Sequence, residues 1–140
     1  MNRIYFQIPG QPVPWARART KGTVHFTPKK QRLEKGAIQY HAKAAMGNKP
    51  LFSGPLHLAV QFVYSHPKSW TEAKKRKPES RWKTSRPDAD NLLKLVKDAL
   101  NGVVYHDDAQ VTFTEVRKLY GEMTGTFVTV EPLIPDYESL

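Results

Sequence analysis

Cysteine is absent from the sequence, and so is any long apolar run. Without cysteine the chain cannot form disulfide scaffolds, cysteine-ligated zinc sites, iron–sulfur clusters or a thiol nucleophile. The most apolar stretch, residues 56–64, is interrupted by His57 and Gln61 and is much shorter than a membrane span. The first residues lack the apolar segment of a signal peptide. We therefore expect a soluble, cytoplasmic protein with no membrane partner.

Several common catalytic motifs are also missing. The sequence has neither a Gly-x-x-x-x-Gly-Lys loop nor a Gly-x-Gly-x-x-Gly loop, so no nucleotide cofactor is expected. Its five histidines show no His-x-His or His-Glu-x-x-His spacing, which gives a zinc hydrolase little support. Only His106, next to a pair of aspartates, is a candidate auxiliary base.

Acidic residues are scarce in the first part of the chain. Residues 1–86 contain 18 basic and 3 acidic residues, whereas residues 87–140 contain 4 basic and 10 acidic residues. A concentrated positive charge attracts a polyanion, because binding releases the counterions condensed on it. Nucleic acid is therefore the first partner to consider. The alternative is a basic surface that serves only solubility.

The length of 140 residues suits a single domain. We expect that domain to span residues 1–132 and a loose tail to span residues 133–140. Hydrophobic periodicity and turn residues predict strands at 4–8, 56–64, 111–120 and 124–131, and helices starting at Thr27, at Ala73 and between Asp88 and Asn91. This order predicts an α+β fold, a mixed β-sheet with helices packed on one face.

Some details of the prediction are specific enough to test. In the first helix Thr27 is the expected N-cap, with Leu33, Ala37, Tyr40 and Ala44 at helical spacing. Residues 11–26 are predicted to be a basic extended loop that ends in a short strand at 23–26. The short helix 73–77 is expected to follow a capping box at Ser69–Glu72 and to end at Pro78. Residues 79–87 are predicted to be a loop, and the strands 111–120 and 124–131 to form a hairpin.

Two groups of aspartates flank the third predicted helix. Asp88 and Asp90 precede it, together with Asn91, and the pair Asp107–Asp108 follows it after a short link. If the chain folds back there, the carboxylates repel one another unless a cation lies between them. Mg²⁺ suits such an all-oxygen ligand set. The alternative is structural: Asp88 or Asp90 caps the helix, and Asp107–Asp108 forms a turn.

Lys94 follows Asp90 by four residues, so the two side chains share one face of the helix. Its ammonium could stabilise the charge that develops on a phosphoryl group, or it could simply pair with Asp98. Which of Asp107 and Asp108 points toward the helix depends on where the next strand begins, and the spacing leaves that choice open.

Basic residues are interleaved with aromatic ones in two predicted loops. Trp15 and Phe26 lie in the first loop, and Trp70 and Trp82 in the second. Aromatic rings can stack on unpaired bases while cationic groups bind phosphates, although a tryptophan in a loop is as often a packing anchor. The candidate nucleic-acid-binding residues are Arg17, Arg19, Lys30, Lys75, Arg76, Arg81, Lys83 and Arg86.

The segments 86–94, 98–102 and 107–111 together resemble the RusA family of Holliday-junction resolvases. The segments 12–14, with Arg17 and Arg19 after them, 26–30 and 69–70 also look like this family, so the resemblance covers nearly the whole chain. It is specific, because two aspartate clusters, an asparagine, a lysine and the helix between them are all in register.

The resemblance implies a small homodimeric endonuclease that cuts four-way DNA junctions symmetrically with Mg²⁺ or Mn²⁺. The catalytic and metal-binding aspartates of the family correspond to Asp88, Asp90 and Asp108, and its motif lysine to Lys94. Asn91 and Asp107 are secondary candidates. Trp15-Ala16 departs from the family, because many relatives have Lys-Gly there. Members are common in prophages, which suggests a phage origin.

Two other functions remain open at this point. One is a metal-dependent nuclease that uses the same residues but prefers flaps or replication forks. The other is a non-catalytic, structure-selective DNA-binding protein in which the aspartates serve as caps and turns. Comparing DNA substrates separates the first from a junction resolvase, and a metal titration separates the second.

Overall fold

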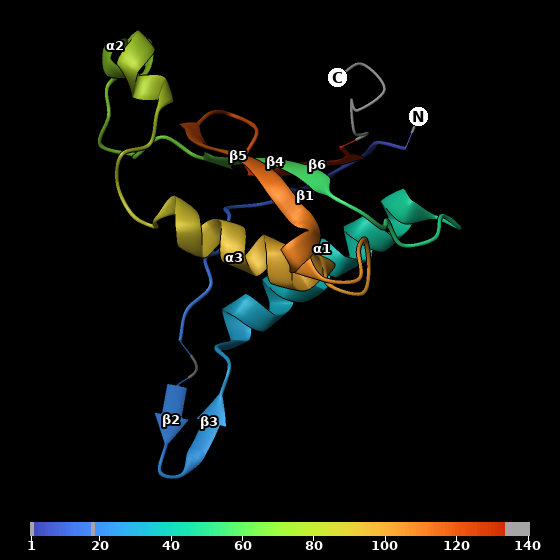
Figure 1. Ribbon diagram of the computed structural model, residues 1–140. Helices are drawn as coiled ribbons and strands as arrows, with labels where there is room; N and C mark the ends of the chain where they lie inside the picture. Colours follow the sequence, from blue (N-terminus) through green and yellow to red (C-terminus); the bar gives the residue numbers. More distant parts are fainter. Residues whose placement is uncertain (1, 18, 134–140) are drawn as a thin grey trace.

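The structure is a computed structural model that describes residues 2–17 and 19–133, without the side chains of Arg19 and Phe26. The strands are β1 (Ile4–Pro9), β2 (Arg19–Lys21), β3 (Val24–Phe26), β4 (Leu56–Tyr64), β5 (Val111–Tyr120) and β6 (Gly125–Pro132). The helices are α1 (Lys29–Met46), α2 (Glu72–Lys75) and α3 (Ala89–Leu100), with two 3₁₀ helices, η1 (Pro78–Arg81) and η2 (Asp108–Gln110). Figure 1 shows their arrangement.

Four strands form the main sheet in the order β1-β6-β4-β5. Strand β6 is antiparallel to both β1 and β4, whereas β4 is parallel to β5. The predicted central strand is confirmed: β4 has a partner on each side, and Leu56, Leu58 and Val60 on one of its faces are buried. The alternation of apolar residues in the sequence therefore marks the face of the sheet that packs on the core.

The predicted hairpin between residues 111–120 and 124–131 is wrong. Strands β5 and β6 do not pair, because β4 lies between them in the sheet. The link between the two strands passes the end of β4, where the Gly121 N–H donates to the Tyr64 carbonyl at 2.9 Å. Two strands that flank a third lie only about 9.6 Å apart, so a link of a few residues spans this distance as readily as it closes a hairpin.

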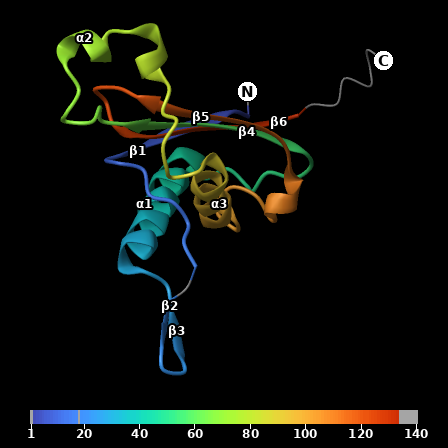
Figure 2. The same ribbon diagram turned by 90° about the vertical axis from the view of Figure 1, so that its left-hand side faces the viewer.

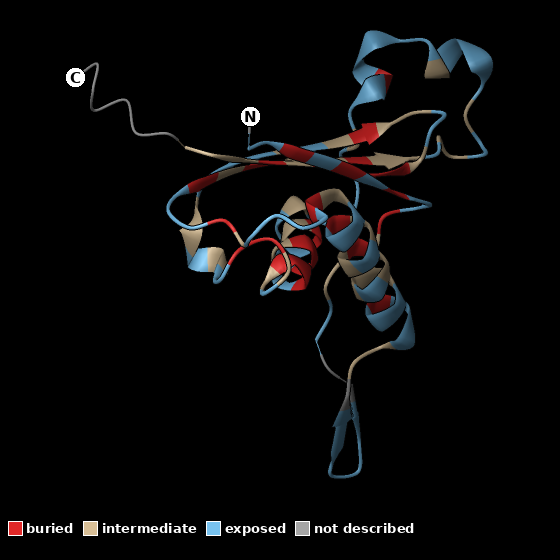
Figure 3. Ribbon diagram, turned by 90° about the vertical axis from the view of Figure 1, so that its right-hand side faces the viewer, coloured by how far each residue is buried: buried red, intermediate tan, exposed pale blue. Residues whose placement is uncertain are grey.

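The two long helices cover one face of the sheet (Figure 2), as the predicted α+β fold requires. Five apolar residues of α3 are buried there, as the sequence pattern predicted: Leu92, Leu95, Val96, Ala99 and Leu100. Figure 3 shows the buried residues concentrated between these helices and the sheet. The core therefore holds α3 against the sheet and fixes both of its ends in space.

Helix α1 presents a different face to the core than its sequence predicted. Its buried residues are Gln31, Ile38, Ala42 and Met46. Leu33 is 64% exposed and Tyr40 is 71% exposed. The helix has apolar residues on both sides, and its packing against α3 and β1 decides which side is buried. Its N-cap is Pro28 without a side-chain hydrogen bond, so Thr27 does not cap the helix.

The segment predicted as a basic loop contains a two-stranded hairpin. Strands β2 and β3 pair, and Gly22, with a φ of 65°, occupies the turn between them. A left-handed backbone of this kind is accessible to glycine at little cost. The predicted short strand is β3, and its partner β2 was not predicted. The hairpin, residues 19–26, extends away from the body of the protein (Figures 1 and 2), and we call it the arm.

Residues 65–86, which we call the basic lobe, carry α2 and η1. Thr71, not Ser69, caps α2: its hydroxyl accepts a hydrogen bond from the Lys74 N–H at 3.1 Å. Pro78 begins η1, so part of the region predicted as a loop is a 3₁₀ helix. Figure 2 shows α2 on the side of the sheet away from α1 and α3.

Among the described residues, no helix combines the length and the apolar character needed to cross a membrane. The predicted tail at 133–140 lies outside the described residues except for Leu133, whose N–H donates to the Pro55 carbonyl at 3.0 Å.

The exposure of α1 predicts a contrast between two of its apolar residues. Ile38 is 1% exposed, so Ile38→Ala should lower the free energy of unfolding by about 2 to 5 kcal/mol, because it leaves a cavity in the core. Leu33→Ala on the exposed side should change it by less than about 0.5 kcal/mol. Urea denaturation followed by circular dichroism measures both, and equal losses would contradict the observed orientation of the helix.

Candidate active site

The first aspartate group lies at the start of α3. Asp88 is the N-cap residue, and its carbonyl accepts a hydrogen bond from the Leu92 N–H at 3.2 Å. Its side chain makes no capping hydrogen bond, and Asp90 lies in the first helical turn. The two carboxylates are exposed and are not used to cap the helix. The structural alternative is thus met in position, because Asp88 is the N-cap residue, but neither carboxylate makes a capping hydrogen bond.

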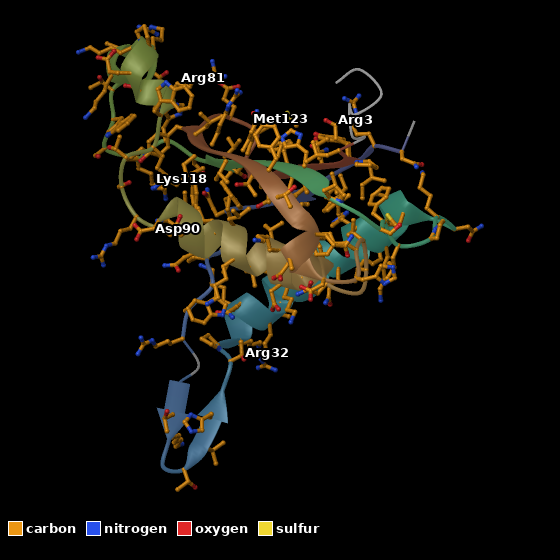
Figure 4. All side chains as sticks on the ribbon, in the orientation of Figure 1. Arg3, Arg32, Arg81, Asp90, Lys118 and Met123 are labelled. Carbon is orange, nitrogen blue, oxygen red and sulfur yellow. The ribbon has the colours of Figure 1, made fainter. Side chains whose placement is uncertain are left out.

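Lys118 of β5 holds the segment that leads into α3. Its ammonium donates to the Ser85 carbonyl at 2.9 Å and to the Pro87 carbonyl at 2.8 Å. Figure 4 shows Lys118 close to the end of α3 that carries Asp90. The lysine therefore fixes the backbone directly before Asp88. Sequence analysis did not single it out, because its partners are carbonyl groups about thirty residues away, which leave no local pattern.

Asp107 and Asp108 have different roles in the structure. The Asp107 carboxylate accepts from the Ala109 N–H at 2.9 Å, and with Gln110 it forms a capping box for η2. Strand β5 begins only at Val111, so the unbroken strand from residue 107, on which the choice between the two aspartates depended, does not exist. Asp107 is committed to the turn, and Asp108 is half-buried on the side of α3.

Gln110 locks this turn onto the rest of the fold. Its side-chain carbonyl accepts from the His106 N–H at 2.9 Å and from the Asp107 N–H at 3.1 Å. Its side-chain amide donates to the Phe52 and Gly54 carbonyls, both at 3.0 Å. Four hydrogen bonds from one side chain thus set the position of Asp108. His106 is exposed beside this turn.

Helix α3 and the turn that contains Asp108 both line a pocket of about 360 Å³. Asp90 and Asp108 line it, together with Lys94 and the indole of Trp15. The buried phenol of Tyr105 lies close by and donates to the Lys97 carbonyl at 2.7 Å. Burial raises the pKa of Tyr105, and the negative charges of Asp108, Asp98 and Asp107 raise it further. The carboxylates therefore create a negative potential at this position.

Asp88 lines a neighbouring pocket of about 680 Å³ rather than the first one. Asn91, Arg86 and Lys30 line that second pocket too, and Trp15 borders both. Within residues 2–17 and 19–133, no three histidine, aspartate or glutamate side chains lie close enough to share one metal ion. The structure thus brings Asp90 and Asp108 together and places Asp88 on the other side of Trp15.

The chemistry of the first pocket fits a hard divalent cation. Asp90 and Asp108 line it and form no ion pair with another described residue, and carboxylate oxygens are ligands that Mg²⁺ prefers. Mg²⁺ is commonly held by one or two carboxylates, retains several waters and completes its coordination with substrate phosphate. The two carboxylates of this pocket therefore match the ligand type and number that such a site uses.

Lys94 does not form the ion pair with Asp98 that was the alternative to a role at this site. Asp98 pairs with Lys35 of α1, with 2.9 Å between the ammonium and the carboxylate. The Lys94 ammonium lies 3.6 Å from the centroid of the Trp15 ring, in a cation–π contact. The lysine therefore remains within the pocket that Asp90 and Asp108 line.

The first loop is fastened to the body of the protein at three points. The backbone N–H of Trp15 donates to the Asn91 carbonyl at 2.9 Å. The backbone N–H of Ala16 donates to the side chain of buried Gln31 at 2.7 Å. The Tyr64 hydroxyl donates to the Pro12 carbonyl at 3.0 Å. Trp15 is half-buried and packs against the core, so in this structure it is a packing residue rather than a free stacking surface.

Arg17 is exposed directly after this fastened segment, and the side chain of Arg19 lies outside the described residues. Lys30 is exposed at the start of α1, near the Asp88 pocket. Lys30 thus lies near Asp88, and Arg17 lies directly before the arm.

In the basic lobe most aromatic rings are already in contact with one another or with a lysine. Trp70 packs against His66 and Tyr120, with the Lys74 ammonium 4.5 Å from its ring centroid. The Lys83 ammonium lies 5.2 Å from the centroid of Tyr120. These contacts stiffen the lobe, which projects several cations on a fixed frame.

The remaining candidate residues of the lobe are exposed to different degrees. Lys75 pairs with Glu72 at 3.0 Å, whereas Arg76, Arg81 and Arg86 are exposed. Trp82 is 49% exposed beside Arg81, so it is the tryptophan whose ring is most available for stacking among the described residues.

Comparison with known proteins identifies the family. The model of the family described as endodeoxyribonuclease RusA matches residues 9–131. The uncharacterized protein YqaN of Bacillus subtilis (strain 168) is 37% identical over 132 residues, which cover 87% of this chain and 91% of YqaN. The crossover junction endodeoxyribonuclease rusA of Lactococcus phage r1t is 34% identical over 110 residues, which cover 74% of this chain and 75% of the phage protein. The chain therefore belongs to the RusA endodeoxyribonuclease family.

Proposed function

We propose that this protein is a metal-dependent endodeoxyribonuclease that resolves four-way DNA junctions by paired, symmetric nicks. The observation that carries the proposal is the pocket in which Asp90, Asp108 and Lys94 meet, in a chain of the RusA family. Asp88 borders the adjoining pocket with Arg86 and supplies a further carboxylate within the same region of the surface. Mg²⁺ is the proposed metal, with Mn²⁺ as a substitute.

Asp90 and Asp108 would hold the metal, and Asp88 would supply a third carboxylate from the adjoining pocket. When bound, the metal supplies an activated water and polarises the phosphodiester. Lys94 places a positive charge where negative charge builds up on the phosphoryl oxygens of the substrate. Trp15 lines this pocket, and its backbone N–H donates to the Asn91 carbonyl of α3.

The charge distribution supports DNA as the substrate. Residues 1–86, which include the arm and the basic lobe, carry most of the basic residues, and the catalytic aspartates follow at the boundary with the acidic part. Arg86 and Lys30 lie beside Asp88, so a phosphate backbone bound by the basic surface would lead to the site.

A homodimer is part of the same proposal. A four-way junction offers two equivalent strands for cutting, and a two-fold symmetric dimer presents two equivalent sites to them. The match to a phage protein is also consistent with a phage or prophage origin for this chain.

The deciding experiment is cleavage of a labelled synthetic four-way junction, with Mg²⁺ or with EDTA, beside a linear duplex and a flap of equal length. Paired nicks at symmetric positions, confined to the junction and dependent on metal, are expected. Faster cutting of flaps or forks would replace the junction by those substrates. Junction binding without metal-dependent cutting would establish a non-catalytic DNA-binding protein instead.

In the same assay Asp90→Asn should reduce the cleavage rate by at least about 100-fold, because even the loss of a residue that only supports a metal ligand costs 10- to 100-fold. Junction binding, measured by fluorescence anisotropy, should be retained, since one fewer carboxylate does not weaken attraction to DNA. Cleavage at the native rate would contradict the assignment of Asp90 as a metal ligand.

Substituting the two neighbouring aspartates should give opposite results. Asp108→Asn should abolish cleavage, because it removes a carboxylate from the pocket. Asp107→Asn should keep most of the activity, since asparagine caps a helix about as well as aspartate. The two variants differ in position by one residue and in chemistry not at all, so equal losses in the cleavage assay would contradict this division of roles.

Replacing Arg17 and Arg19 together by alanine should weaken junction binding without affecting the metal site. Each phosphate contact contributes about 1 to the slope of log K against log salt concentration, so the slope should become shallower by about 2. Anisotropy titrations at several salt concentrations measure this slope. An unchanged slope would remove this loop from the DNA interface.

A further inference from the structure

The contact between Lys94 and Trp15 is the tightest of its kind in the part of the chain that the structure describes. The Lys94 ammonium lies 3.6 Å from the ring centroid, whereas the other lysine and arginine contacts with aromatic rings measure 4.5 to 5.7 Å. The backbone N–H of Trp15 donates to the Asn91 carbonyl, one turn before Lys94 on the same helix, and its side chain packs against the core. Ring and lysine are thus held together by α3.

The same lysine makes no ion pair with the carboxylates around it. Lys94 lines one pocket with Asp90, Asp98 and Asp108, yet none of these groups lies within 4.0 Å of its ammonium among the ion pairs of residues 2–17 and 19–133. Asp98 is already paired with Lys35. Lys94 therefore rests on the ring although two unpaired carboxylates share its pocket.

A lysine in this position could compete with a metal. An ammonium paired with Asp90 or Asp108 would occupy the oxygens that a divalent cation needs, and the flexible four-carbon chain of lysine allows such a pairing. An aromatic face attracts the same ammonium through its quadrupole without using any carboxylate oxygen. The Trp15 ring can thus bind the Lys94 ammonium inside the pocket without any contact to the proposed metal ligands.

We propose that Trp15 is a positioning residue that holds the Lys94 ammonium beside Asp90 and Asp108 but not paired with them, which leaves both carboxylates available to a divalent cation. The inference rests on the metal site of the proposed function. It adds that Trp15 prevents Lys94 from occupying the carboxylates of that site.

The test measures metal binding to the full-length protein without DNA, from the EPR signal of free Mn²⁺. Trp15→Leu removes the aromatic face and should weaken Mn²⁺ binding about three- to tenfold, the range equivalent to the worth of one cation–π contact. Trp15→Phe keeps an aromatic face and should bind Mn²⁺ within about twofold of the unchanged protein. Trp82→Leu, which removes an exposed tryptophan beside Arg81, is the matched control and should have no effect.

A second pair of variants separates positioning from mere packing. In the Lys94→Met background the competing cation is gone, so adding Trp15→Leu should change Mn²⁺ binding by less than about twofold. Circular dichroism confirms that each variant is folded. If Trp15→Leu binds Mn²⁺ as the unchanged protein does, or weakens binding equally in both backgrounds, the positioning role is wrong. If the unchanged protein binds no Mn²⁺, the proposed metal site fails and this inference with it.

Discussion

Two carboxylates that share a pocket repel each other, and the surroundings of α3 hold Asp90 and Asp108 there despite that repulsion. Asp90 is fixed because five residues of its helix are buried against the sheet. Asp108 is fixed because the side chain of Gln110 makes four hydrogen bonds around its turn. The backbone at both positions is therefore fixed by contacts with the rest of the fold. The fold thus keeps two carboxylates at one pocket, with the Lys94 ammonium lining the same pocket.

The surrounding cations divide into two kinds. Lys35, Lys75 and Lys118 are committed to partners within the fold, whether a carboxylate or backbone carbonyls. Arg17, Arg76 and Arg86 are exposed and have no ion pair among the described residues. Within the first kind, Lys118 holds the backbone directly before Asp88, and the second kind is available to phosphates. Total charge does not reveal this division, which depends on the neighbours that the fold provides.

The strongly periodic parts of the sequence predicted their structure well. The buried stripe of α3 and the alternation in β4 each have one apolar side, so the sequence alone determines which side faces the core. Helix α1 has apolar residues on two sides, and only its neighbours decide that Ile38 rather than Leu33 is buried. The hairpin prediction failed for a similar reason, because a short link does not reveal whether a third strand lies between the two it joins.

For the candidate site, the sequence predicted the aspartates and Lys94 but not the residues that hold them in place. Gln110, Lys118 and Gln31 act through hydrogen bonds to residues far away in the chain, so no spacing rule marks them. The placement of Trp15 on Lys94 is a contact of the same kind.

The residues of the candidate site come from segments that lie far apart in the chain. Trp15 comes from near the beginning, Asp90 from α3 in the middle, and Asp108 from the turn before β5, which is held in the sheet by β4. Contacts between such distant segments form late in folding, because their loops are costly to close. During synthesis the pocket lined by Asp90 and Asp108 therefore cannot assemble until the turn before β5 and the strand itself have left the ribosome. A truncated or half-made chain would carry much of the basic surface without a complete cutting site, so nuclease activity is tied to completion of the fold.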